Sequence, residues 1–338
     1  MKFTSLPFTV ALAFLTLSGL PAWTQSEAPS EPLHAAFFVE PLVQKGFGGT
    51  SYDLSFNYGG GWTGLSRLEF PQVSLEAGAV LGLTLNSETR REWLFEAAFS
   101  HSTLAMSGTM NDYDWWEFTG IPKIPWSYTY STDSTISWHA AVDAAWTLGS
   151  TGPWLLALYG TYRFQYTSHV EDGYTGWQYS SPGPSFGPYT LGSAVSSTTD
   201  ILEYSLTSHT IGLGLMGSLQ PSPRFTLELR TAFTPVYAFD RDDHKLRTKL
   251  STAEGWGVGI YADLKAVYRL NRIAKSVIPY LVLNGDINYF VVNTLQTQYW
   301  YGNADAGNGA PQGTLITGVG HVITSVQYQV ALRFGFSF

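Results

Sequence analysis

A pair of acidic residues beside a pair of tryptophans is the first feature of this sequence that could perform chemistry. Asp112 and Asp114 stand two positions apart and are followed by Trp115 and Trp116. In an extended backbone, residues two positions apart point to the same side. The two carboxylates would therefore share one space, where each makes ionisation of the other less favourable. Such a pair can hold a shared proton and deliver it to a reacting group.

A second cluster combines carboxylates with a histidine. The run from Asp240 to His244 reads Asp-Arg-Asp-Asp-His, so an extended chain places Asp242 and His244 on one side. A carboxylate beside an imidazole orients the ring and keeps it basic. Either cluster alone is explained more simply as a solvated acidic loop. The place of both clusters in the chain therefore decides between the two interpretations.

The composition indicates a β-protein whose outer surface does not face water. Charged residues make up 13% of the 338 residues and aromatic residues 15%, and there are 34 glycines. That charged share is about half of what soluble globular domains carry. The net charge of −8 argues against a nucleic-acid partner. Cysteine is absent, which excludes disulfides, thiolate nucleophiles and cysteine metal sites.

The N-terminal residues resemble a secretory signal. Lys2 is followed by an uncharged apolar run from Leu6 to Leu20 and then by small residues around Ala22. We therefore expect residues 1–24 to be a signal peptide and residues 25–338 to be the mature protein. No later run is long and apolar enough for a transmembrane helix. The sequence thus predicts export, with any membrane insertion made by strands.

Alternating residues predict those strands. From Val326 to Phe338 every second residue is apolar, and the residues between are polar or small. The same pattern encloses charged residues in further segments: 93–99 encloses Glu96, 138–146 encloses Asp143, 225–233 encloses Glu228 and Arg230, and 260–270 encloses Asp263 and Lys265. Apolar residues facing outward and charges facing inward are typical of a membrane barrel with a polar lumen. A soluble β-sandwich would have the opposite arrangement.

The predicted connections alternate between short and long. Short ones fall near residues 86–91, 149–153, 220–224 and 271–276, and long ones near 55–63, 108–126, 177–200, 240–246 and 302–318. This spacing predicts an all-β fold: a single antiparallel ten-stranded transmembrane β-barrel with long extracellular loops. The two acidic clusters then lie on the extracellular rim after the third and seventh strands. Since these strands are four apart in a ring of ten, the clusters face each other across the mouth.

Facing clusters of this kind could activate a water molecule. His244 would take a proton from the water and Asp242 would orient the imidazole, while Asp112 and Asp114 would hold the same water from the other side. No Gly-x-Ser-x-Gly or His-Glu-x-x-His motif is present, and we expect no metal site and no cofactor. Calcium bound by the acidic loops is a weaker alternative. The other histidines are interpreted as ordinary lumen or loop residues: His34, His101, His139, His169, His209 and His321.

Both motifs resemble those of the omptin family of outer-membrane proteases. The family's Asp-x-Asp-Trp motif corresponds to residues 112–115, and its Asp-x-Asp-x-His motif to residues 240–244. The resemblance implies an aspartic-type endopeptidase with Asp242 and His244 as the dyad and Asp112 and Asp114 as the opposing pair. It also implies cleavage of peptides or proteins next to basic residues, which acidic side chains in the groove would bind. Asp240 matches one such side chain, and Asp53 is a plausible match for the other.

The sequence departs from the family pattern at two places outside the two motifs. Where the family often carries a histidine before the fourth strand, this chain has residues 131–133, Ser-Thr-Asp. The family also binds lipopolysaccharide through arginines on the outer wall. The nearest position on the fifth strand is Gln165, and Arg163 is the closest base. Lipopolysaccharide is therefore a partner that the resemblance implies, and we predict that this chain requires it less than the family does.

Two functions without catalysis remain open from the sequence. A porin or diffusion channel would need the inward charges for conduction and would not need the rim carboxylates. An adhesin would bind a partner through its loops, which are rich in tyrosine and tryptophan, and would lose no hydrolysis if they were altered.

Overall fold

The computed structural model describes residues 34–86, 91–118, 121–178, 193–274 and 276–338. The predicted signal peptide lies outside them. The strands are β1 (His34–Gly59), β2 (Trp62–Pro71), β3 (Ser74–Asn86), β4 (Arg91–Leu104), β5 (Met106–Phe118), β6 (Ile121–Thr151), β7 (Trp154–Gln178), β8 (Ser193–Ser222), β9 (Phe225–His244), β10 (Lys249–Arg269), β11 (Ile278–Trp300) and β12 (Leu315–Ser337). Two 3-10 helices, η1 (Lys245–Arg247) and η2 (Ala306–Asn308), follow β9 and β11. Among the described residues, no helix is long and apolar enough to cross a membrane.

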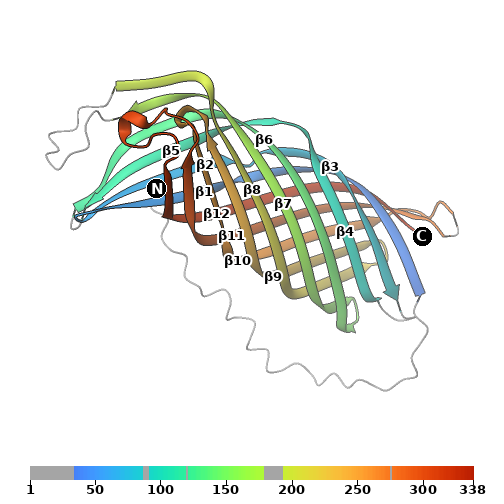
Figure 1. The fold of residues 1–338 in the computed structure, drawn as a ribbon. Coiled ribbons are helices and arrows are strands. Elements are labelled where there is room, and N and C mark those ends of the chain that lie inside the picture. The colour runs from blue at the N-terminus through green and yellow to red at the C-terminus, as the bar shows by residue number, and fades with distance from the viewer. Residues whose placement is uncertain (1–33, 87–90, 119–120, 179–192, 275) are drawn as a thin grey trace. The chain divides into compact units, whose positions relative to one another are not determined.

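The strands form one antiparallel sheet that closes into a ring through the pairing of β1 with β12 (Figure 1). The second strand of the ring is divided into β2 and β3, and the third into β4 and β5. At one end β3 and β4 complete the circle between β1 and β6, and at the other end β2 and β5 do so. Each end therefore has ten strands round the ring, which confirms the predicted all-β ten-stranded barrel.

Alternation along each strand separates an apolar outer face from a polar lumen. On β9, Leu229 and Phe233 are 51% and 58% exposed, whereas Glu228 and Arg230 are 7% and 1% exposed. Apart from Thr231, the outward residues of β9 are apolar up to Phe239, and polar residues follow at Arg241 and beyond. This apolar band fits the lipid-facing surface of a membrane barrel. The predicted inward placement of the charges is confirmed.

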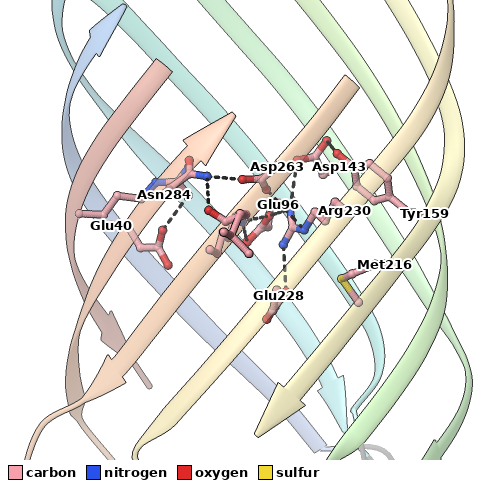
Figure 2. Close-up of polar contacts among 12 residues, drawn as sticks. Glu40, Glu96, Asp143, Tyr159, Met216, Glu228, Arg230, Asp263 and Asn284 are labelled. Atoms are coloured by element: carbon pink, nitrogen blue, oxygen red, sulfur yellow. Dashed lines mark hydrogen bonds and ion pairs between the residues drawn. The ribbon is translucent and has the colours of Figure 1, made fainter. Parts of the chain in front are cut away.

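Charged side chains from opposite sides of the ring meet inside the lumen (Figure 2). Arg230 of β9 forms ion pairs with Glu96 of β4 and Asp143 of β6, the latter at 3.3 Å. Lys265 of β10 lies 2.8 Å from the same Glu96. Because β4 and β9 are four strands apart in the ring, this network crosses the lumen within the apolar band.

The strands continue well beyond the band, and this corrects three predicted connections. Residues 108–118 belong to β5, residues 121–126 to β6, and β9 runs to His244. Between β1 and β2 the turn is reduced to Gly60 and Gly61, whose φ angles of 60° and 82° suit a tight hairpin. The segments remain extended because neighbouring strands satisfy their backbone hydrogen bonds, and because Tyr, Trp and Thr favour strands. The acidic clusters therefore lie on strands and not on loops.

Candidate active site

The first acidic pair lies on the lumen side of β5. Asp112 is opposite Leu68 of β2 and Thr129 of β6 in the register of the sheet. Asp114 accepts a hydrogen bond of 2.5 Å from the hydroxyl of Ser127. Burial, together with the neighbouring Asp114 carboxylate, raises the pKa of Asp112 well above its usual value. Asp112 is thereby favoured to hold a proton that an isolated aspartic acid would lose.

Asp242 lies on the lumen side of β9 and is 2% exposed. Its Oδ2 accepts a hydrogen bond of 2.5 Å from the hydroxyl of Tyr52, a residue of β1. Burial raises the pKa of Asp242, while the ammonium of Lys249 and the bond from Tyr52 oppose the rise. Its second oxygen, Oδ1, is buried and has no hydrogen-bond partner among the described residues.

His244 is the last residue of β9 and is held in its neutral form. Burial, followed by the nearby cations Lys249 and Arg247, lowers the pKa of His244 well below its usual value. Its Nδ1 is buried and is without a partner in the described part of the chain. The expectation that Asp242 keeps this imidazole basic is wrong, because desolvation and two positive charges lower its pKa. Within the described residues, no hydrogen bond joins Asp242 to His244.

Three of the four predicted catalytic residues line one cleft. Asp112, Asp114 and His244 surround a cleft of about 360 Å³, together with Arg247 and other residues of the upper strands. β5 and β9 are separated by four steps in the ring, as the sequence predicted. Asp242 does not line this cleft, although its charge contributes to the raised pKa of Asp112. The structure therefore brings both acidic clusters into one electrostatic environment.

A short turn after β9 fixes the position of His244. η1 is followed by Thr248, which has a left-handed φ of 48° and donates its backbone N–H to the carbonyl of Lys245. The segment after β11 packs on this turn, with the N–H of Tyr301 donating to the carbonyl of Thr248 at 2.9 Å. Arg247 also lies 3.1 Å from Asp305. The turn is therefore attached to the segment after β11 by a hydrogen bond and an ion pair.

The two predicted specificity residues have different surroundings. Asp240 lies on the lumen side of β9, is 1% exposed and lies 2.7 Å from Nε2 of His321. Asp240, like Asp242, does not line the cleft, and Asp53 lies outside the lumen altogether. Its neighbour Tyr52 faces the lumen, so Asp53 faces outward, where it forms a two-point ion pair with Arg67 of β2. An outward side chain cannot reach the cleft while its strand keeps this register.

Several groups that lie beside the aspartates and the histidine of β9 were not predicted from the sequence. Tyr52, Tyr204 and His321 pack as a buried group, with ring centroids 5.3 Å and 5.1 Å from that of Tyr52. Tyr204 also donates to Asp240 at 3.4 Å. Lys249 is 5% exposed and lies opposite His244 in the sheet. The alternation of side chains along each strand predicts that these residues face the lumen. It does not predict which of them contact the aspartates.

The predicted outer-wall position on β7 is also corrected. Gln165 is 7% exposed and lines the lumen. Arg163 lies on the same side, 3.5 Å from Asp143 and with its guanidinium 3.6 Å from the centroid of the Tyr261 ring. Gln165 was compared with the family's outer-wall position, and that comparison is wrong because its side chain faces the lumen. Neither residue bears on lipopolysaccharide binding, which remains a prediction.

A closed ring of ten antiparallel strands, apolar outside and polar inside, defines an outer-membrane-type β-barrel with carboxylates and a histidine gathered at one end. Its fold is similar to that of the outer membrane protease OmpT from Escherichia coli, with a TM-score of 0.66 and 16% sequence identity over 90% of this chain and 96% of that chain. The predicted resemblance to an omptin is thus confirmed at the level of the fold.

Two further solved barrels match with low scores. OprG from Pseudomonas aeruginosa gives a TM-score of 0.29 at 11% identity, covering 91% of this chain and 98% of that chain. A FadL homologue from Pseudomonas aeruginosa gives 0.26 at 9% identity, covering 89% of each chain. These scores are too low to carry an argument. No protein-family model and no curated protein matches the sequence.

Proposed function

We propose that this protein is an omptin-like endopeptidase of the outer membrane. The observation that carries the proposal is the convergence of Asp112, Asp114 and His244 on one cleft from strands on opposite sides of the ring. Their ionisation supports it, because the same burial favours a protonated Asp112 and a neutral His244. Hydrolysis of a peptide bond needs such an acid and such a base.

In the proposed mechanism, neutral His244 takes a proton from a water molecule as the water oxygen bonds to the peptide carbonyl carbon. A protonated Asp112 donates a hydrogen bond to the carbonyl oxygen, on which negative charge develops. The carbon–nitrogen bond then breaks, and His244 returns its proton to the leaving amine. Asp242 would stabilise the imidazolium as it forms, through the oxygen that has no partner in the described residues.

We further propose cleavage next to basic residues, with the cleft facing the outside of the cell. Asp240 carries the specificity in this proposal, since it lies on the same side of β9 as Asp242 and His244. A guanidinium or ammonium group of the substrate would replace part of its interaction with His321. Asp53 has no part in this proposal because it is paired with Arg67 on the outer face.

One observation weighs against the alternative of a passive porin. The ion pairs between Arg230, Glu96 and Asp143 join side chains across the lumen, and Arg230 is 1% exposed (Figure 2). Open porins leave an aqueous channel along the barrel axis. An adhesin does not need the cleft lined by Asp112, Asp114 and His244. An assay of peptide hydrolysis distinguishes an adhesin from a peptidase.

The test is to incubate the purified barrel with a fluorogenic peptide that contains Arg-Arg. We expect cleavage of this peptide and loss of cleavage when the arginine before the scissile bond is replaced by Glu, because Asp240 would repel the carboxylate. His244→Ala should lower the rate of cleavage by about 10²- to 10⁴-fold. His209→Ala is the matched control, since His209 pairs with Tyr162 away from the cleft. Equal turnover of the two peptides would refute the specificity, and absence of turnover by the folded wild type would refute the peptidase.

A further inference from the structure

A second group of reactive side chains lies in the lumen apart from the cleft. Asp133 of β6 and Glu171 of β7 are directly opposite each other in the sheet, and His169 is two residues before Glu171. All three side chains are 0% exposed. Each offers one nitrogen or oxygen atom, and these atoms lie within 4.8 Å of one another.

The hydrogen bonds of this group leave much of its binding capacity unused. Asp133 Oδ2 accepts from Thr135 Oγ1 at 2.6 Å and lies 3.0 Å from His169 Nδ1. Asp133 Oδ1, His169 Nε2 and both carboxylate oxygens of Glu171 are buried without a partner in the described residues. Buried polar atoms are normally paired, so four unpaired atoms in one place indicate a missing ligand.

The charge of the group points to a cation. Among the described residues, neither Asp133 nor Glu171 forms an ion pair with lysine or arginine, and His169 is the single basic partner of Asp133. The ring of Phe70 lies 5.1 Å from that of His169, and Tyr204 lies 6.0 Å away, so one side of the group is an aromatic wall. Two carboxylates are not held together in such surroundings without a compensating positive charge or a proton.

We propose that Asp133, His169 and Glu171 bind a divalent transition-metal ion of the zinc type. One imidazole and two carboxylates suit zinc, whose bonds to nitrogen and oxygen are about 2.0–2.2 Å long. Calcium requires six to eight oxygens, and magnesium keeps several waters, so an imidazole-containing site of three ligands favours neither. Thr135 is a positioning residue, because its hydroxyl orients the Asp133 carboxylate.

The metal would stabilise the barrel and would not take part in hydrolysis. Asp133 is opposite Gly108 on β5, four residues below Asp112. At the rise of a strand this separates Asp133 from Asp112 by about 13 Å. Glu171 is paired with Leu202 of β8, and Leu202 is paired with His244 of β9, so two strand spacings, about 10 Å, separate the group from the histidine. At these separations the ion would not touch the water activated at the cleft. The ion would instead tie β6 to β7 beneath the cleft and hold the wall formed by Phe70 and Tyr204.

The competing explanation is a shared proton. Burial and the adjacent Asp133 raise the pKa of Glu171 to about 10, so a neutral Glu171 could donate to Asp133 and no ion would be needed. The two explanations differ in their response to Glu171→Gln. Glutamine can replace a protonated glutamic acid as a donor, but it cannot replace a charged metal ligand.

The test starts from the purified, untagged chain after treatment with EDTA and removal of the chelator. Zinc uptake is measured by calorimetry and by elemental analysis, and cobalt(II) is used as an absorbing probe. We expect about one zinc ion per chain and a higher unfolding temperature when zinc is restored. Glu171→Gln should weaken zinc binding by at least about 100-fold, and Thr135→Val by about 10- to 100-fold.

Asp172→Asn is the matched control, because Asp172 is the exposed neighbour of Glu171 on the same strand and should leave zinc binding unchanged. If Glu171→Gln does not fold, Thr135→Val carries the test alone. The proposal is overturned if the wild type takes up no zinc, or if Glu171→Gln binds zinc as the wild type does. None of these measurements requires peptide hydrolysis, so their outcome does not depend on the proposed peptidase.

Discussion

His244 lies at the rim of the barrel, yet burial and two nearby cations favour its neutral form. The neutral imidazole is the form that can act as a base. The pKa of an unperturbed histidine is about 6.5, and the folded-state value lies below it. Since the imidazole works only when neutral, His244 should remain active as the pH falls through 6.5 and lose activity at a lower pH. The measurement is kcat/KM for the dibasic peptide against pH. An acid limb above pH 6.5 would contradict this assignment.

Removing the imidazole tests its role directly. His244→Ala should lower the rate by about 10²- to 10⁴-fold, the usual contribution of a positioned general base. Folding of the variant is checked by heat-modifiable mobility on a gel, since a closed barrel migrates differently from an unfolded chain. A folded variant with nearly full activity would reduce the rim cluster to a solvated surface and return the protein to the porin or adhesin interpretation.

Lys249 should set the working pH of His244. Its ammonium lies opposite His244 in the sheet, lowers the pKa of that histidine and opposes the rise in the pKa of Asp242. Lys249→Met keeps an apolar stem of similar length and removes the charge. The acid limb of kcat/KM should therefore move to higher pH in this variant. Lys123→Met, at an exposed position, is the control, and an unmoved limb in Lys249→Met would show that burial alone sets the pKa.

At the scale of the element, the turn after β9 should control turnover more than stability. A Cβ added to Gly302 would lie 2.7 Å from Thr248 Oγ1 and 2.8 Å from its Cβ. Gly302→Ala must therefore displace the turn that ends β9 and, with it, His244. Gly307→Ala in the same connection is the control, because its added Cβ meets nothing within 4 Å. We expect Gly302→Ala to lower kcat by about 10-fold or more, since misplacements of about 1 Å can cost that much.

The control variant and the unfolding temperature distinguish an effect on turnover from an effect on stability. Gly307→Ala should match the wild type in both kcat and unfolding temperature. A Gly302→Ala variant that also keeps the wild-type kcat would show that this contact does not position the histidine.

Alternation along the strands made much of this fold predictable, and the same rule was applied too narrowly. It placed Glu96, Asp143 and Arg230 in the lumen and the apolar residues outside. On β7 the same alternation places His169 and Glu171 together on the inward side. The second buried group was missed because each histidine was considered by itself. The same rule places Arg163 and Gln165 in the lumen, on the face opposite to the outer-wall position with which Gln165 was compared.

The contacts between distant strands were beyond any local pattern. Tyr52 meets Asp242 across 190 residues of sequence, and His321 meets Asp240 across 81. Such pairings depend on the stagger of every strand round the ring, which no local window of sequence contains. The extension of β5 and β9 beyond the apolar band was missed for a related reason. Their polar residues appear loop-like until neighbouring strands are known to satisfy their backbone groups.

At the scale of the whole molecule, the barrel is held from inside by the network around Arg230 (Figure 2). Arg230 is 1% exposed and forms ion pairs with Glu96, Asp143 and Glu228. Arg230→Met would leave these largely buried carboxylates with less compensating positive charge. Removing one partner of a buried ion pair costs about 3–5 kcal/mol, and the remaining contact from Lys265 to Glu96 should keep the loss near the lower value.

This loss is measured as the free energy of unfolding in urea, followed by heat-modifiable gel mobility at equilibrium. Arg224→Met is the control, because Arg224 is exposed at a turn and, among the described residues, its side chain hydrogen-bonds to Asn271 alone. Surface contacts of that kind contribute about 0–1 kcal/mol. Equal stability of the two variants would mean that the barrel tolerates unpaired lumen carboxylates, for example by admitting water. In that case Arg230→Met should also conduct ions in a planar bilayer. The ion pairs across the lumen would then no longer weigh against a porin.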